Sequence, residues 1–320
     1  MCNIRYGAVI IADNVASRMG KMRPMLPLAD ESMISRTIRL LKKQGTEKIA
    51  VVTGYRHEVI EDHLKGTDAV CVYNEDFVSS SVYRSYELGL NKLAECGERA
   101  DRFFLLRGGD PVLDEETFGR MAECGAGIVA PRFLNDRGKP LLISSEELEH
   151  ISDLIKNGDH EQACEYFESQ VHEIDVDDEG VVMEIDTKQD YETLLGLFYA
   201  RSGRRASLRM ELDLRMGTEE LFFDNDTALF LELIAVTGSI SSACHAMNIS
   251  YTKGWKLINK VEEKFERKII SRNVGGSDGG GCVLTRDGKY LLDSYKYMQR
   301  ELSNISNRIF TELFRQQPGC

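Results

Sequence analysis

Residues Gly7 to Leu28 read GAVIIADNVASRMGKMRPMLPL and join a short apolar run to a basic cluster. The run Ala8 to Ile11 is long enough for one buried strand, and it ends at Asp13 and Asn14. The cluster that follows holds one glycine and three cations, Arg18, Gly20, Lys21 and Arg23. Glycine and cations beyond the carboxyl end of a strand suit a triphosphate, and a solvated basic turn is the alternative.

Two aspartates follow apolar runs in the same way. Asp110 comes shortly after Phe103 to Leu106, and Asp186 comes directly after Val181 to Ile185. Mg²⁺ usually takes one or two carboxylates together with phosphates, so the pair could hold one Mg²⁺ against a nucleotide. The structural alternatives are that Asp110 opens a turn before Pro111 and that Asp186 caps a helix.

The elements that position these residues alternate between strands and helices. We predict strands at 8–11, 49–52, 69–73, 103–106, 128–130, 141–143, 171–174 and 181–185, and helices at 34–41, 59–64, 82–93, 118–124 and 191–199. Such alternation implies a mainly parallel sheet covered on both faces. The first part is therefore predicted to be a three-layer α/β domain.

Composition limits the class of protein. The 320 residues are enough for two domains, each with its own core. We found no run of about eighteen apolar residues and no signal-peptide layout, so we expect a cytoplasmic protein without a membrane partner. The eight cysteines form no CxxC or Cys/His cluster, which argues against zinc and disulfides. The net charge of −12 is concentrated in the first part, and the excess of cations near residues 250–300 suits a polyanion, unless it is chance clustering.

A second domain is predicted to begin near residue 203. The stretch 201–217 opens with glycine and clustered arginines, and its apolar residues then alternate from Leu208 to Leu214 like a half-buried strand. Three helices are predicted next, at 228–236, 240–247 and 251–265, with Ser239 and Ser250 as caps of the last two. This is the outline of a helix-turn-helix, which binds duplex DNA.

The predicted DNA contacts lie on the third helix and just beyond it. They are Ser239, Ser250, Tyr251, Thr252, Lys253, Lys256, Lys260 and Arg272. Strands at 269–270 and 283–284, joined by a glycine-rich tip, resemble the wing of a winged helix, with a solvated loop as the alternative. We expect Trp255 to belong to the core.

A helix from about Lys289 to Arg315 is predicted to form a homodimer. Its apolar residues step by four and three, at Leu291, Tyr295, Met298, Leu302, Ile305 and Ile309. The alternative is that this helix packs back on its own domain. The predicted division of the chain is 1–202, 203–218 (linker and first strand), 219–288 (winged helix-turn-helix) and 289–316 (dimerisation helix).

Several motifs in order make the first part resemble the MobA/MocA-like nucleotidyltransferases, which make molybdopterin cytosine or guanine dinucleotide. Ala8 to Leu28 resembles the signature LAAGxSxRMGxxKxLLP. The motifs that resemble the molybdenum cofactor cytidylyltransferase branch are NEDF and SSS at 74–81, GDP at 109–111, IVAP at 128–131, GKP at 138–140 and DVDDEGVVMEIDTKQDY at 175–191. The resemblance implies a GT-A/Rossmann-like fold and transfer of a nucleoside monophosphate from CTP or GTP to a phosphorylated pterin, with release of pyrophosphate.

The resemblance also implies residue roles. Arg18 and Arg23 would act on the triphosphate, and Asp110 would hold Mg²⁺ with Asp186 as a second contact. The nucleotide-binding set that it implies is Ile11, Ala12, Asn14, Gly20, Asn74, Ser80 and Gly109. In-line attack on the α-phosphorus would leave the protein mainly to position groups and neutralise charge.

Three departures from the family pattern concern the phosphate loop. Asp13 and Asn14 stand where the family has Ala-Gly, Arg23 stands where it has lysine, and Asp110 is followed directly by Pro111. A carboxylate about 4 Å from a phosphate would cost roughly 4 kcal/mol at an effective dielectric constant of about 20.

The second part resembles the DNA-binding domain of the molybdate-responsive regulators of the ModE type, a LysR-like winged helix. The resemblance runs from Asp226 to Thr285 and includes TGSISSACHAMNISYTKGWKLINKVEEKF and GGSDGGGCVLT. No stretch before Cys320 resembles the molybdate-binding modules of that family, so we expect no sensing through such modules.

Two functions follow. One is an enzyme that transfers a nucleotide to molybdopterin and also regulates transcription. The other is a transcription factor whose degenerate transferase domain senses a nucleotide or pterin without turning it over.

Overall fold

The computed structural model describes residues 4–13, 22–97, 99–203, 210–272 and 281–314. The described residues up to 203 form one compact unit, and those from 210 onward form a second. Among the helices in these ranges, none is long and apolar enough to cross a membrane.

The first unit is built on a sheet with the strand order β10-β7-β9-β6-β1-β4-β5, and β8 pairs with β7. In chain order its strands are β1 (Tyr6–Ala12), β4 (Thr46–Thr53), β5 (Ala69–Tyr73), β6 (Arg102–Arg107), β7 (Ile128–Phe133), β8 (Asp136–Arg137), β9 (Leu141–Ser144) and β10 (Val171–Asp175). The strands β6, β1, β4 and β5 are mutually parallel, β10 is parallel to β7, and β9 is antiparallel to β6 and β7. The predicted mainly parallel sheet is confirmed.

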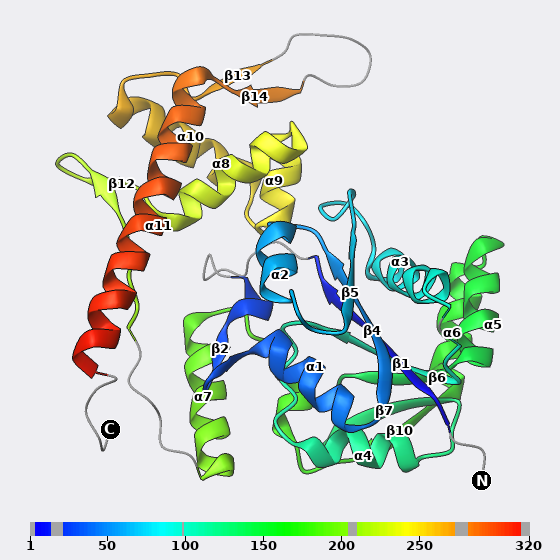
Figure 1. Ribbon diagram of the computed structural model, residues 1–320. Helices are drawn as coiled ribbons and strands as arrows, with labels where there is room; N and C mark the ends of the chain where they lie inside the picture. The colour runs from blue at the N-terminus through cyan, green and yellow to red at the C-terminus, as the bar shows by residue number, and fades with distance from the viewer. Residues whose placement is uncertain (1–3, 14–21, 98, 204–209, 273–280, 315–320) are drawn as a thin grey trace. The chain divides into compact units, whose positions relative to one another are not determined.

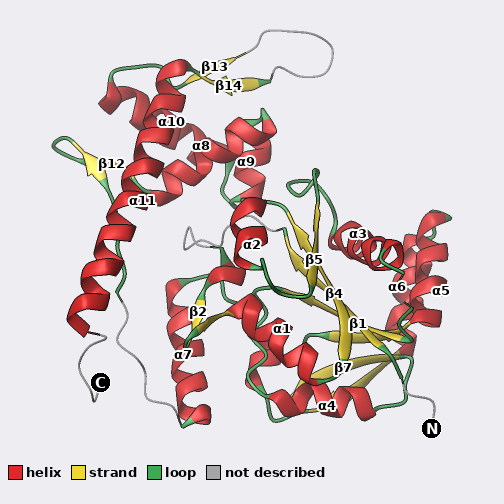
Figure 2. Cartoon of the chain, in the orientation of Figure 1, coloured by secondary structure: helices red, strands yellow, loops and turns green. Residues whose placement is uncertain are grey.

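Helices cover both faces of this sheet (Figures 1 and 2). They are α1 (Met33–Lys43), α2 (His57–His63), α3 (Val82–Glu95), α4 (Glu115–Glu123), α5 (Ser145–Lys156), α6 (His160–Gln170) and α7 (Lys188–Ser202). Two 3₁₀ turns, η1 (Arg23–Met25) and η2 (Glu179–Val182), and a small hairpin of β2 (Pro27–Leu28) and β3 (Glu31–Ser32) complete the unit.

Alternate residues of the central strands face opposite layers, because side chains of a strand point to opposite faces. Ala8 and Ile10 of β1 pack with residues of α1 and α4, such as Ile34 and Phe118. Val9, between them, packs with Leu93 of α3 and with residues of α5 and α6. Burial on both faces explains the continuous apolar runs in the sequence, and the three-layer α/β architecture is confirmed.

One expectation for this unit was wrong. Residues 181–185 form no strand: Val181 and Val182 belong to η2, and Ile185 is buried in the loop that follows. Apolar residues in a loop can fill a core as those of a strand do, so the short run alone was ambiguous. The helices α5 and α6 lie where no helix was predicted, and among their residues only Ala163 of α6 is fully buried.

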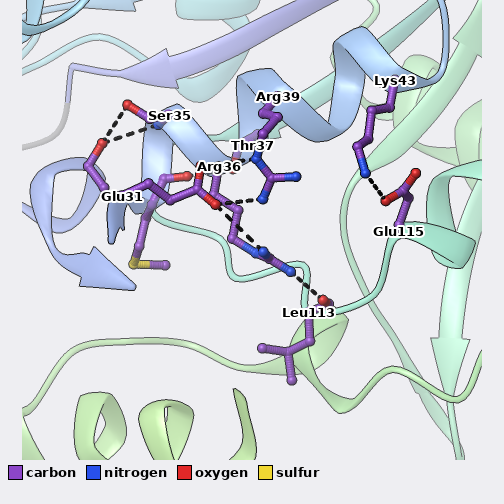
Figure 3. Close-up of polar contacts among 10 residues, drawn as sticks. Glu31, Ser35, Arg36, Thr37, Arg39, Lys43, Leu113 and Glu115 are labelled. Carbon is purple, nitrogen blue, oxygen red and sulfur yellow. Dashed lines mark hydrogen bonds and ion pairs between the residues drawn. The ribbon is translucent and has the colours of Figure 1, made fainter. Parts of the chain in front are cut away.

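Polar contacts tie α1 to the small hairpin and to the loop before α4 (Figure 3). Glu31 of β3 accepts hydrogen bonds from Arg39 Nε at 3.1 Å and Nη2 at 2.5 Å. Arg36 Nη2 donates to the Leu113 carbonyl oxygen at 2.5 Å, and Lys43 Nζ lies 2.6 Å from Glu115 Oε2. These contacts fix the segment that follows η1 against the body of the unit.

The second unit contains mainly helices. Its elements are β11 (Met216–Gly217), β12 (Leu221–Phe223), α8 (Asn225–Thr237), α9 (Ile240–Ala246), α10 (Tyr251–Phe265), β13 (Ile270–Arg272), β14 (Cys282–Leu284) and α11 (Arg286–Phe314). The predicted helix-turn-helix is formed by α9 and α10, and the predicted wing strands pair antiparallel as β13 and β14. Both predictions are confirmed. The predicted strand at 208–214 was wrong within the described residues 210–214, which are irregular and mostly exposed.

Close packing of α8, α9 and α10 forms the core of this unit. Gly254 of α10 is required there, since a β-carbon on it would lie 2.4 Å from Cys244 Sγ and 2.8 Å from the Phe230 ring. Every residue of α8 from Thr227 to Ile234 is buried except Glu232, so α8 lies at the centre of this core.

Helix α11 has two different halves. Leu291, Leu292 and Tyr295 are buried, and Tyr295 donates its hydroxyl hydrogen to the Leu214 carbonyl oxygen at 2.7 Å. The following apolar residues of the predicted seam are exposed: Leu302, Ile305 and Ile309. The first half thus packs on its own unit, as the alternative stated, and the second half keeps an apolar face open.

Candidate nucleotide site and DNA-binding face

The order of strands reverses at β1, which lies between β4 and β6. Open parallel sheets bind ligands outside the carboxyl ends of their strands at such a point. Ile11 and Ala12 end β1 there, and their side chains are buried in the sheet. The backbone N–H of Gly108 donates to the Ile11 carbonyl oxygen at 2.7 Å. The loop after β6 therefore lies beside the end of β1.

Asp110 lies in that loop and is surrounded by cations. Its Oδ2 accepts a hydrogen bond from the backbone N–H of Arg107 at 3.1 Å. Burial raises the pKa of the Asp110 carboxyl, and the positive charges of Lys139, Arg107 and Arg23 oppose this shift. Two of these cations also have acidic partners, Asp186 beside Arg23 and Glu184 beside Lys139, so the end of the sheet gathers charges of both signs.

Arg23 begins η1 and lies against the same loop. A β-carbon on Gly109 would lie 2.5 Å from that of Arg23, so the glycine allows the two segments to approach. Arg23 Nη2 lies 2.5 Å from Asp186 Oδ1. The structure therefore brings three predicted residues together, Arg23, Gly109 and Asp110, and adds Asp186 through an ion pair.

Arg107 and Lys139 belong to this site, and the sequence analysis assigned them no role. Lys139 is held by its backbone N–H, which donates to the Val181 carbonyl oxygen at 2.8 Å, and its Nζ lies 3.5 Å from Glu184 Oε1. The signals were present in the sequence: Arg107 ends the apolar run before Asp110, and Lys139 is the lysine of the GKP motif.

Asp13 is turned inward instead of lying free at the end of β1. Its side chain is 3% exposed, and Oδ2 accepts hydrogen bonds from Asn74 Nδ2 at 2.9 Å and Ser85 Oγ at 2.5 Å. Asn74 Nδ2 also lies 2.8 Å from Ser80 Oγ. Asn74 and Ser80, which were predicted to bind nucleotide, thus belong to a buried network around Asp13. Their contact with nucleotide stays a prediction.

The remaining predicted residues of the phosphate loop, Asn14, Arg18 and Gly20, lie outside the described residues. Asp186 does not cap α7. That cap is Thr187, whose side chain accepts from the Asp190 backbone N–H within a capping box. The alternative that Asp186 caps this helix was therefore wrong.

The fit of a Mg²⁺ ion rests on Asp110. Among the described residues there is no group of three or more His, Cys, Asp or Glu side chains that could hold a metal. Mg²⁺ needs only one or two carboxylates when phosphates supply the other ligands, so Asp110 suits it. Asp186 suits it less well, because the Arg23 guanidinium already engages Oδ1 of its carboxylate.

The candidate DNA-binding face lies on α9 and α10. Ser239 and Ser250 cap these helices by accepting from the backbone N–H groups of Ser242 and Lys253, as predicted. The exposed residues at the start of α10 are Tyr251, Thr252, Lys253 and Lys256. Such hydroxyl and ammonium groups suit contacts with bases and phosphates.

Other residues of this face have structural partners. Lys260 Nζ donates to the Leu221 carbonyl oxygen at 2.9 Å, so it fastens β12 to α10. Trp255 is half-buried and meets the Tyr251 ring edge-on at 6.3 Å between centroids. Arg272 ends β13, and its side chain lies outside the described residues. The DNA contacts of all the predicted residues stay predictions.

Comparison with known proteins identifies the first unit. The family model for the MobA-like NTP transferase domain matches residues 8–173. The chain belongs to this family. It is 22% identical to the molybdenum cofactor cytidylyltransferase of Escherichia coli (strain K12) over 196 residues, which are 58% of this chain and 93% of that protein. The crystal structure of Rv0371c from Mycobacterium tuberculosis H37Rv has a TM-score of 0.47 and 22% identity, and the match covers 61% of this chain and all of that one.

The C-terminal region of this MobA-like protein is similar to ModE regulators. It is 39% identical over 95 residues to the DNA-binding transcriptional dual regulator ModE of Escherichia coli (strain K12). That match covers 30% of this chain and 35% of ModE, so the chain spans about a third of the length of this relative. The protein therefore joins a MobA-like domain to a ModE-like region.

Proposed function

We propose that this protein transfers a nucleoside monophosphate from CTP or GTP to a molybdopterin-type acceptor and also binds DNA as a transcriptional regulator. The observation that carries the first activity is the placement of Asp110 among Arg23, Arg107 and Lys139 at the reversal point of the sheet. The acceptor is inferred from the name of the cytidylyltransferase relative.

The site residues divide the work of this reaction. The three cations would bind the triphosphate and offset the negative charge that moves to pyrophosphate when the bond to the α-phosphorus breaks. Asp110 would hold Mg²⁺, which supplies further charge neutralisation when it is bound. The protein itself contributes mainly the positions of these charges.

The second activity rests on the ModE-like region. The exposed start of α10, with Tyr251, Thr252 and Lys253, is the part of a helix-turn-helix that enters the major groove. A homodimer through the open half of α11 would present two such helices to a two-fold operator. Nucleotide transfer and transcription of genes for molybdenum metabolism would then be linked in one chain.

A specific observation favours a second candidate, a sensor without turnover. Asp13 stands where the family has a small residue, and Asn74, a predicted nucleoside contact, hydrogen-bonds to Asp13 in this structure. A site with this arrangement could retain a nucleotide or pterin without catalysing transfer. In that case ligand occupancy alone would regulate DNA binding.

The experiment that separates the candidates is pyrophosphate release from CTP and from GTP, with molybdopterin and Mg²⁺. Asp110→Asn keeps the shape of the side chain and removes its charge, and Asp153→Asn on the exposed face of α5 is the matched control. Turnover that is lost in Asp110→Asn and retained in Asp153→Asn supports the enzyme. Nucleotide binding without any pyrophosphate in the unmodified protein supports the sensor.

A further inference from the structure

The Arg23 side chain has both a fixed partner and an unused donor. Nη2 lies 2.5 Å from Asp186 Oδ1, with 31% of the Arg23 side chain and 44% of the Asp186 side chain exposed. Arg23 Nε is buried and has no hydrogen-bond partner among the described residues. A buried donor without a partner costs free energy, so a ligand that accepts from it would be favoured.

Asp186 is itself held in place by the start of α7. The backbone N–H groups of Asp186 and Thr187 donate to Asp190 Oδ2 at 3.1 and 2.7 Å. Tyr191 OH donates to the Pro27 carbonyl oxygen at 2.5 Å, and Tyr191 is buried. Two contacts therefore join the segment from η1 to β2 to the start of α7: the Arg23–Asp186 ion pair and the Tyr191–Pro27 hydrogen bond.

The guanidinium also acts on the acid across the site. Burial raises the pKa of Asp110, and the positive charge of Arg23 is among the effects that oppose this shift. The pKa of Asp190 is lowered mainly by the hydrogen bond from the Thr187 backbone N–H, with a smaller contribution from Arg23. Arg23 therefore lies between the loop after β6 and the start of α7. A cation in that position faces whatever binds beside Asp110.

We propose that Asp186 is a positioning residue that holds the Arg23 guanidinium toward a polyphosphate bound beside Asp110, and that it is not a metal ligand. The inference rests on the proposed binding of a nucleoside triphosphate at this site. It differs from the role that the family resemblance implied for Asp186, because Oδ1 of its carboxylate is engaged by the Arg23 guanidinium. The fixed guanidinium then supplies a positive charge that does not depend on metal.

This arrangement predicts that a triphosphate binds without a divalent metal. The probe is inorganic triphosphate in EDTA, measured by calorimetry with the full chain, because it tests the anion site separately from base recognition. Asp186→Asn and Arg23→Gln should each weaken binding about fivefold, since the pair is partly exposed and screened. The double variant should be no weaker than Arg23→Gln alone, because Asp186 acts only through the guanidinium that Arg23→Gln removes.

Three comparisons separate positioning from other roles. Asp186→Glu, which keeps the charge, should restore most of the affinity. Glu184→Gln removes the carboxylate that lies beside Lys139. Its effect on triphosphate affinity should add to that of Arg23→Gln, in contrast to the effect of Asp186→Asn. Mn²⁺ binding, followed by electron paramagnetic resonance, should be weakened by Asp110→Asn and left unchanged by Asp186→Asn.

The outcomes distinguish this inference from the proposed function. Triphosphate affinity unchanged in Asp186→Asn, or Mn²⁺ affinity lowered by it, overturns the inference. Absence of triphosphate binding in EDTA by the unmodified protein overturns the inference and leaves the proposed enzyme to be tested by pyrophosphate release with Mg²⁺. Coupled loss of binding in Asp186→Asn and Arg23→Gln, together with no turnover of CTP or GTP, supports the inference and counts against the enzyme.

Discussion

Replacing Asn74 with alanine should destabilise the first unit strongly. Asn74 and Asp13 are each 3% exposed, and Asn74 Nδ2 donates to Asp13 Oδ2 at 2.9 Å. Asn74→Ala leaves the buried carboxylate with Ser85 as its remaining side-chain donor among the described residues. A hydrogen bond to a buried charge contributes about 1.5–3 kcal/mol, and an unsatisfied charged group costs more than a neutral one.

The expected loss is about 3 kcal/mol of unfolding free energy, which corresponds to roughly 6–12 °C in melting temperature for a domain of this size. The assay is thermal unfolding followed by circular dichroism and by tryptophan fluorescence. Trp255 is the single tryptophan and lies in the second unit, so a transition seen by circular dichroism alone belongs to the first unit.

Two variants make this test specific. Asn91→Ala on the exposed side of α3 is the control and should melt close to the unmodified protein. Adding Asp13→Asn to Asn74→Ala should recover part of the loss, because the buried group without a donor is then neutral. The reasoning is refuted if Asn74→Ala melts within about 2 °C of Asn91→Ala, or if the double variant is less stable than Asn74→Ala.

Three further predictions concern the second unit. Asp226 is exposed at its surface, and partial desolvation, followed by the charge of Asp224, raises its pKa above the usual 3.8. Its ionised form therefore opposes folding, so Asp226→Asn should raise the melting temperature at pH 7, and this gain should vanish as the pH falls below about 3.8. A gain that does not change with pH would contradict this prediction. So would an equal gain in the control variant Asp293→Asn, at an exposed position of α11. Lys253→Ala should lower the salt dependence of binding to a mixed-sequence DNA duplex by about one counterion per recognition helix, and Lys65→Ala in the first unit should leave it unchanged. The measurement is the slope of the logarithm of the binding constant against the logarithm of the salt concentration, by fluorescence anisotropy. Equal slopes for Lys253→Ala and the unmodified protein would count against α10 as the helix that contacts DNA. Ile305→Arg should convert a dimer to a monomer in sedimentation equilibrium, and a dimer that persists would place the interface elsewhere.

The sequence predicted an element correctly where its local pattern is compatible with only one kind of secondary structure. The run from Phe103 to Leu106 is apolar without interruption and is a buried strand of a parallel sheet. Ser250 before a periodic segment capped a helix as expected. Helix α6 was missed because its apolar periodicity is weak, whereas α5 has apolar residues at helical spacing, Leu148, Ile151 and Ile155, from which no helix was predicted.

The sequence by itself determined that cations and two acids, Asp13 and Asp110, follow the ends of β1 and β6, because residue type and position along a strand are local properties. Only the tertiary structure decided how those charges pair. Asp13 accepts a hydrogen bond from Asn74, which lies 61 positions away in the sequence. Arg23 forms an ion pair with Asp186, which lies just before α7 near the end of the first unit's sequence. A charged side chain takes the partner that the fold places within a few ångströms, and that choice depends on strand order and loop path, which no spacing in the sequence specifies.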